Sequence, residues 1–195
     1  MTTNDKTWFE KQVNRELFRQ TLKETALSQV GYDETPVNRT PYGKWYGMDG
    51  NAWCAMFVSW CYGMTADKLN VPNPLTVLGA KGFAHVTSTW ARIVDKHPQW
   101  MLAQNDTPMP GDIFFWDHDS RAGGPGHTEL YVRHISRKNL VITGLWVGGN
   151  TNSGFSRTGG SVCSHLHPVK VGKVGAHGYL LGVARPTREF WTAKP

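Results

Sequence analysis

The chain has 195 residues, 39% of them hydrophobic, which is enough for one domain with a substantial core, and its three cysteines are too few for the disulfide framework of a small secreted protein. A formal net charge of +6 favours an anionic partner, which on charge alone is a nucleic acid, an acidic membrane surface or an acidic cell-wall polymer. The basic residues are nevertheless scattered, without a Lys/Arg-rich block, zinc-finger spacing or an RNP-like aromatic motif, so we predict no nucleic-acid partner.

The N-terminal residues lack the apolar run of a signal peptide, and no later segment approaches the roughly 18 apolar residues that a membrane span needs. We therefore expect a protein that is made in the cytoplasm, without stable membrane association. Thr7 and Glu10 form a capping-box pattern, and apolar residues then recur at helical spacing towards Val30. This pattern predicts a first helix that ends at Gly31.

Residues 31–50 are rich in Gly, Pro, Asn and aromatic residues without a sustained period, and we predict a long ordered loop here. A buried helix follows, because apolar residues recur at three- and four-residue spacing from Cys54 to Cys61 and the other sides are apolar too. Cys54 would lie in the first turn, where backbone N–H groups and the helix dipole favour an anion such as a thiolate. We expect Cys61 to be a core residue.

The same kind of spacing predicts another short helix from Phe83 to Ile93. After the turn at residues 108–112 the pattern changes to short apolar runs that are typical of strands. The predicted strands cover residues 113–116, 127–132, 140–147, 161–166 and 178–184. Helices followed by strands with short turns are typical of an α+β fold, here N-terminal helices packed on an antiparallel sheet of five to six strands.

A cysteine nucleophile needs a histidine base, and that base needs a third group to orient its ring. Among eight histidines, His127 is the best candidate, because it follows a glycine-rich segment and begins a strand whose alternation places Glu129 on the same face. Cys163, His165 and His167 also share a strand face, as zinc ligands would. Such a group is more often part of a polar sheet surface, so we predict no metal and no other cofactor.

Four motifs in series resemble the CHAP family of cysteine, histidine-dependent amidohydrolases and peptidases, and the similarity extends over residues 25–186. The motifs are Asn51–Trp60, Pro110–Trp116, Gly126–His127 at the start of a strand, and Gly149–Asn152. The resemblance implies a papain-like (NlpC/P60-like) fold and cleavage of peptidoglycan, either at the amide between muramic acid and alanine or within the peptide. We expect residues 1–195 to form one catalytic domain, monomeric and without a separate wall-binding domain.

The resemblance also assigns roles to single residues. Cys54 matches the nucleophile of the family, His127 its general base, and Asn150 the polar residue that orients the histidine. Many members carry a Glu two residues before this Asn, where this chain has Gly148. Glu129 is the obvious substitute, but its spacing of roughly 7 Å from His127 along the strand suits electrostatic tuning better than a hydrogen bond. We therefore rank Glu129 as an auxiliary residue, behind Asn150.

Several aromatic residues near the motifs are candidates to bind the sugars and peptide of the substrate: Trp45, Tyr46, Trp53, Trp146 and Phe155. Core packing is the alternative, and for Trp53 the two are about equally supported. Some family members bind calcium through carboxylates just upstream of the cysteine, whereas only Asp49 stands there in this chain. We therefore expect no required metal.

The resemblance leaves several biological roles open. The leading hypothesis is a phage or prophage endolysin that reaches the wall through a membrane lesion. A virion-associated wall hydrolase or a secretion-system effector would use the same chemistry. A non-catalytic peptidoglycan-binding module is the alternative from another class; Gly148 in place of Glu favours it, and the presence of Cys54, His127 and Asn150 together disfavours it.

Overall fold

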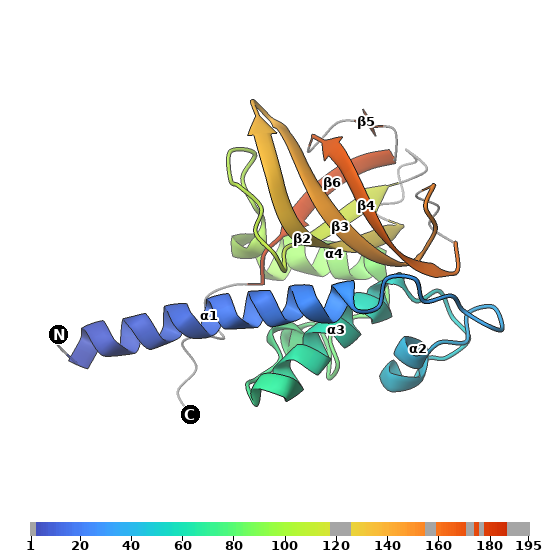
Figure 1. The fold of residues 1–195 in the computed structure, drawn as a ribbon, viewed down its shortest axis with the longest axis horizontal. Helices are drawn as coiled ribbons and strands as arrows, with labels where there is room; N and C mark the ends of the chain where they lie inside the picture. The colour runs from blue at the N-terminus through green and yellow to red at the C-terminus, as the bar shows by residue number, and fades with distance from the viewer. Residues whose placement is uncertain (1–2, 118–125, 155–158, 171–173, 176–177, 187–195) are drawn as a thin grey trace.

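The computed structural model describes residues 3–117, 126–154, 159–170, 174–175 and 178–186. Within these residues the helices come first and the strands afterwards, as predicted (Figure 1). The helices are α1 (Thr3–Leu27), α2 (Pro41–Tyr46), α3 (Cys54–Leu69) and α4 (Val86–Lys96), with two 3₁₀ turns, η1 (Pro74–Val77) and η2 (Pro98–Trp100). None of the helices in the described part of the chain has the length and apolar character to span a membrane.

The strands form one antiparallel sheet in the order β4-β3-β2-β1-β6-β5. Their bounds are β1 (Ile113–Asp117), β2 (His127–Lys138), β3 (Val141–Thr151), β4 (Ser161–Val169), β5 (Val174–Gly175) and β6 (Gly178–Ala184). The expected five to six strands are thus confirmed. Strand β2 extends six residues beyond its predicted end because that half is largely exposed and polar, and so lacks the apolar alternation by which a strand is predicted.

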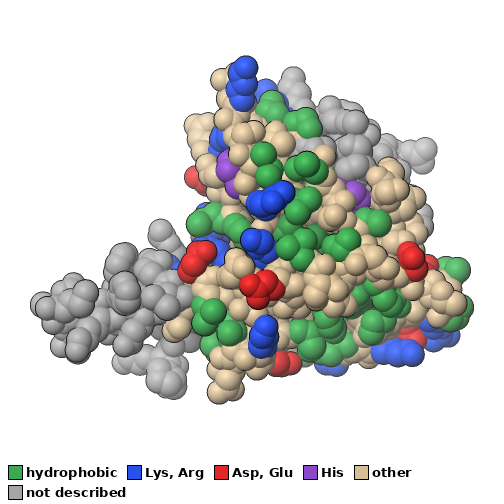
Figure 2. Space-filling model, viewed as in Figure 1, with side chains coloured by type: hydrophobic (Ala, Val, Ile, Leu, Met, Phe, Trp, Pro, Cys, Tyr) green, Lys and Arg blue, Asp and Glu red, His purple; other side chains and the backbone are tan. Residues whose placement is uncertain are grey.

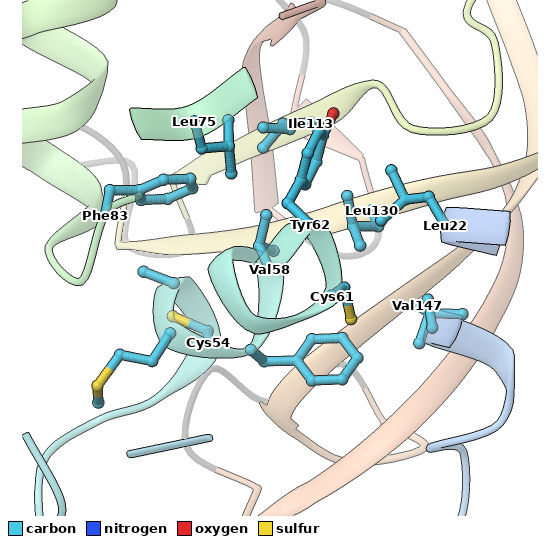
Figure 3. Packing of buried hydrophobic residues seen from close by; sticks show 14 of the residues in the cluster. Leu22, Cys54, Val58, Cys61, Tyr62, Leu75, Phe83, Ile113, Leu130 and Val147 are labelled. Carbon is cyan, nitrogen blue, oxygen red and sulfur yellow. The ribbon is translucent and has the colours of Figure 1, made fainter. Parts of the chain in front are cut away.

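Both faces of the sheet are covered by apolar side chains. The main core lies between the sheet and α1 and α3, where Leu22, Val58 and Tyr62 meet Ile113 and Leu130 (Figure 3). A second cluster occupies the opposite face and contains, among others, Phe114, Trp116, Tyr131, Trp146 and Leu180. Because each face has its own core, the successive residues of β1 are all buried.

Several predicted helix boundaries were wrong. The long loop predicted at residues 31–50 contains the helix α2, whose six residues are too few to carry a periodic pattern. Its start is fixed by the Thr40 hydroxyl, which accepts the Gly43 N–H at 2.9 Å, and by Pro41 in the first turn. Helix α1 begins at Thr3, four residues before the predicted Thr7, and ends at Leu27, short of the predicted end at Gly31. Helix α4 begins and ends three residues later than the predicted Phe83 and Ile93.

Candidate active site

Cys54 is the first residue of α3 and is only 5% exposed. The preceding residue, Trp53, anchors this helix end: its ring stacks on Tyr42 with centroids 5.2 Å apart, and its Nε1–H donates to Glu34 Oε2 at 2.6 Å. Trp53 makes no side-chain cap to α3. In the described structure, the Trp53 side chain therefore accepts no hydrogen bond from the N–H groups of the first turn of α3. These groups can face a substrate oxygen beside the thiol.

His127 is the first residue of β2 and is 1% exposed. Leu130 and Val132 pack into the main core, so His127 and Glu129, which alternate with them, lie on the opposite face with Tyr131. His127, the first residue of β2, still interacts with Cys54, the first residue of α3, through a side-chain hydrogen bond. The predicted juxtaposition of thiol and imidazole is therefore present.

The pKa of His127 reports this environment. Burial lowers it, but hydrogen bonds to Cys54 and Glu129, together with their charges, raise it more, to about 10. The Nε2 atom of His127 lies 3.6 Å from Glu129 Oε1. The site thus favours a protonated imidazole between a sulfur and a carboxylate.

Glu129 is closer to His127 than predicted. The expected 7 Å described the spacing along the strand, whereas the carboxylate folds back so that Oε1 lies 3.6 Å from His127 Nε2, an ion-pair distance that suits the electrostatic role predicted for Glu129. Space for this carboxylate comes from Gly148 on β3: a Cβ at that position would lie 2.6 Å from Glu129 Oε1 and 2.9 Å from its Cγ. The carboxylate of Glu129 therefore occupies the place where a side chain at 148 would begin.

A cleft of about 340 Å³ opens beside Cys54. One wall comes from the segment before α3, with Met48, Asn51 and Ala52, and the other from the start of α4, residues 84–87. Gly126, next to His127, completes the lining. On the face of the molecule shown in Figure 2, acidic and basic side chains are interspersed, so the net charge of +6 does not form a single basic patch there.

A family model described as CHAP domain matches residues 45–144, just over half of the chain. The matched segment includes Cys54, His127 and Glu129. This chain belongs to the CHAP family. Its α+β arrangement is the papain-like fold of that family, and CHAP membership implies a Cys/His-dependent amidohydrolase or peptidase that acts on peptidoglycan. Comparison with curated proteins and with solved structures gave no match.

Asn150, the third residue predicted from the CHAP resemblance, lies on β3 and is buried. Its φ is +57°, in the left-handed region, at the point where the β3–β4 pairing loses register. Asn is among the few non-glycine residues that adopt this conformation readily. The bulge by itself thus accounts for an Asn at this position, whereas the carboxylate beside the histidine comes from Glu129.

For two of the aromatic residues, the predicted role in substrate binding was wrong. Trp53 and Trp146 are both 0% exposed, Trp53 in the main core and Trp146 in the second cluster on the far face of the sheet. Trp45 and Tyr46 are partly exposed, but they pack near Gly63, Lys81 and Gly82 and are not among the residues that line the cleft. Phe155 lies outside the described residues.

His165 on β4 belongs to the site, although the sequence did not predict it there. It was grouped with Cys163 and His167 as a weak zinc candidate, but its Nδ1 lies 2.8 Å from Glu129 Oε1 and its Nε2 lies 2.8 Å from the Asn152 carbonyl oxygen. The side chain of His167 is outside the described residues, and among the side chains that are described no three His, Cys, Asp or Glu form a metal site. Only the strand register brings His165 and Glu129 together.

Proposed function

We propose that this CHAP protein hydrolyses an amide bond of peptidoglycan, with Cys54 as nucleophile and His127 as general acid and base. The observation that carries the proposal is the buried contact of the Cys54 thiol, the His127 imidazole and the Glu129 carboxylate at the edge of a cleft. A nucleophile, its base and an orienting carboxylate in contact are the parts that thiol-dependent acyl transfer needs.

In the proposed cycle, the Cys54 thiolate attacks the carbonyl carbon of the substrate amide while the proton resides on His127. The tetrahedral intermediate collapses, the C–N bond breaks, and His127 delivers its proton to the leaving amine. A thioester joins the acyl group to Cys54. Neutral His127 then takes a proton from water as the water attacks the thioester, which releases the acid product and restores the ion pair.

The developing oxyanion would be held by the N–H groups of the first turn of α3. Trp53 supplies no side-chain cap at this end, and the first turn of α3 contains no acidic residue, so the helix dipole there acts on the oxyanion without local opposition. In other enzymes, removal of one such donor costs about 3 to 4 kcal/mol of transition-state stabilisation.

We assign the orienting role to Glu129 rather than Asn150. The carboxylate holds Nε2 of His127 as the imidazolium forms and, when the ring is neutral, keeps the proton on Nε2, so that Nδ1 is free to act as base. Many CHAP members carry a Glu where this chain has Gly148. In this arrangement the carboxylate of Glu129 on β2 takes the place of that Glu, because it fills the space beside β3 at Gly148. This weakens the main argument for a non-catalytic binding module.

The finer proposal is a phage or prophage endolysin that lyses the host from within. The CHAP family and a positive charge suited to a wall rich in carboxylates and phosphates support it. A virion-associated hydrolase or a secreted effector would share the chemistry. Expression in a susceptible host, with and without a pore-forming partner in its membrane, separates these roles: an endolysin lyses the culture only with the pore.

The chemistry is tested by digestion of purified peptidoglycan with wild type, Cys54→Ala and Cys61→Ala. Cys61 is the matched control because it lies on the same helix but is 0% exposed in the core. Wild type and Cys61→Ala should release fragments with newly freed amino groups, and Cys54→Ala should not. The product masses then distinguish an amidase from an endopeptidase. If wild type pellets with several wall types but cleaves none, a binding module replaces this proposal.

A further inference from the structure

The contacts at the site do not end at Glu129. His165 enters from β4, the edge strand of the four-strand run β4-β3-β2-β1, and its side chain is 1% exposed. Its Nδ1 is 2.8 Å from the same Oε1 atom that lies 3.6 Å from His127 Nε2. One carboxylate oxygen is therefore shared by two imidazoles, and the shorter contact is the one to His165. The buried chain has four members: Cys54, His127, Glu129 and His165.

The partners of His165 define its protons. Nε2 faces the backbone carbonyl of Asn152, and a carbonyl oxygen only accepts, so Nε2 carries a hydrogen. Nδ1 faces the carboxylate of Glu129. Burial raises the pKa of Glu129, but the hydrogen bonds from His127 and His165 lower it more, so this carboxyl is ionised and only accepts. Each ring nitrogen of His165 therefore lies 2.8 Å from an oxygen that only accepts, and Nδ1 is the one directed at Glu129.

We propose that His165 is a positioning residue that holds the Glu129 carboxylate in place and ionised throughout the reaction. The proposal rests on the function proposed above, since it assigns to Glu129 the orientation of His127. It adds a second buried pair to the site: Cys54 with His127, and Glu129 with His165. No substrate contact is assigned to His165.

The need for a second pair follows from the proposed cycle. When His127 gives its proton to the leaving amine, the thiolate has become a thioester and the imidazole is neutral. Glu129, 2% exposed, then has no charged partner on the His127 side, and a buried carboxylate without one is strongly destabilised. His165 contacts the same carboxylate from the other side at 2.8 Å, so Glu129 keeps its place beside Nε2 of His127 while Nδ1 activates water.

Two substitutions separate this role from a structural one. In His165→Asn the amide nitrogen lies near the place of Nδ1 and can still donate to Glu129, while the donor to Asn152 is lost. In His165→Gln the longer side chain places its amide near Nε2, keeping the donor to Asn152 and losing that to Glu129. The proposal predicts a loss of about 10- to 100-fold in fragment release for His165→Gln, as for other residues that hold a directly acting group, and a smaller loss for His165→Asn.

The second readout is the rate of Cys54 alkylation by iodoacetamide as a function of pH, with peptide masses resolving Cys54 from Cys61 and Cys163. In His165→Gln the acid limb of this profile should move to higher pH, because Glu129 no longer supports protonated His127; in His165→Asn it should move less. Cys163 also interacts with Glu129, so the profile is repeated in a Cys163→Ser background. Alkylation needs no peptidoglycan and reports on the site even if wild type cleaves no wall, in which case only the proposed function fails.

A double-mutant cycle completes the test. If His165 acts through Glu129, His165→Gln should cost little further activity, and move the alkylation profile little further, once Glu129→Gln is present. The proposal is overturned by equal losses in His165→Asn and His165→Gln, by a larger loss in His165→Asn, by wild-type behaviour of both, or by additive effects in the cycle. Any of these assigns His165 to tethering the Asn152 segment or to packing.

Discussion

Asp112 and Glu129 are buried carboxylates with contrasting partners. Asp112, 1% exposed, stands just before β1 and accepts two hydrogen bonds from Arg185, from Nε at 2.8 Å and from Nη2 at 2.7 Å, and a third from the Met109 N–H. Glu129, 2% exposed, stands in β2 between two imidazoles. Both are enclosed by protein, yet one partner is permanently charged and the others can change charge.

The pKa values separate the two carboxyls further. Burial raises the pKa of Asp112, and the Arg185 hydrogen bonds do not fully offset it. Burial also raises the pKa of Glu129, but there the two imidazoles prevail and the pKa is lowered. An arginine cannot release its proton, so the Asp112–Arg185 pair can only fasten the segment after β6 to the start of β1. The imidazoles can exchange protons, which makes the Glu129 group suited to a reaction.

Glu129→Gln should separate the two carboxyls most sharply. The amide keeps the volume of the side chain but removes the charge that stabilises protonated His127, and replacement of the orienting acid by its amide in a serine-protease triad costs about 10,000-fold. We expect at least about a 100-fold loss of fragment release per folded molecule, together with a lower unfolding temperature because the buried imidazoles lose the charge between them. The measurements are a peptidoglycan digestion rate and a thermal melt. Activity within a few-fold of wild type would return the orienting role to Asn150.

Gly148→Ala should reproduce part of that loss without touching the carboxylate. The added Cβ would lie 2.6 Å from Glu129 Oε1, so the carboxylate must move away from His127. Gly144→Ala is the matched control on the same strand, since its Cβ would lie 2.2 Å from the Tyr131 ring instead. Both variants should lose about 1 to 3 kcal/mol of stability, but only Gly148→Ala should lose activity beyond its folded fraction, by about tenfold or more. Equal specific activities of the folded proteins would contradict this.

Gly148 also shows why the sequence predicted only part of the site. Cys54 begins α3 and His127 begins β2. The apolar period of the helix was sufficient to find Cys54, and the glycine-rich segment before the strand was sufficient to find His127. Glu129 was underrated because spacing along one strand ignores the neighbouring strand, where Gly148 makes room for a folded-back carboxylate. His165 could be placed only through the register that pairs it with Trp146 across β3 and β4.

The fold followed the sequence more closely, because element type depends on local periods. The order of helices and strands was predicted from apolar spacing, and the errors were in the short helix α2, the ends of α1 and α4, and the C-terminal ends of β2, β3 and β4. Whether an aromatic side chain is buried was harder to predict. Trp53 lies beside Cys54 in sequence, but its ring is turned into the core by stacking on Tyr42 and by its bond to Glu34, and no period in the sequence encodes that choice.

Asp112→Asn should affect stability and leave the chemistry of the site intact. The substitution removes the charge that Arg185 binds through two hydrogen bonds, and the loss of a charged hydrogen-bonding partner costs about 2 kcal/mol. The side chain of Arg185 is 22% exposed, so water partly replaces the lost partner and limits the cost. Chemical denaturation measures the change. The pH profile of Cys54 alkylation should match wild type; a shifted profile would mean that the two carboxyl groups are coupled.

The last effect we expect is a difference in the pH dependence of stability. The pKa of His127 is raised to about 10, above its unfolded value of about 6.5, so its protonated form contributes stability that is complete below the unfolded pKa and is lost as the pH rises towards 10. The unfolding temperature of wild type should therefore fall between pH 7 and about 10, and in His127→Gln it should fall less. Asp112→Asn is the control, because the pKa of Arg185 is raised and this residue stays charged throughout. Parallel curves for wild type and His127→Gln would show that the proton on His127 is not held by Cys54 and Glu129, and the contrast between the two carboxyls would then rest on geometry alone.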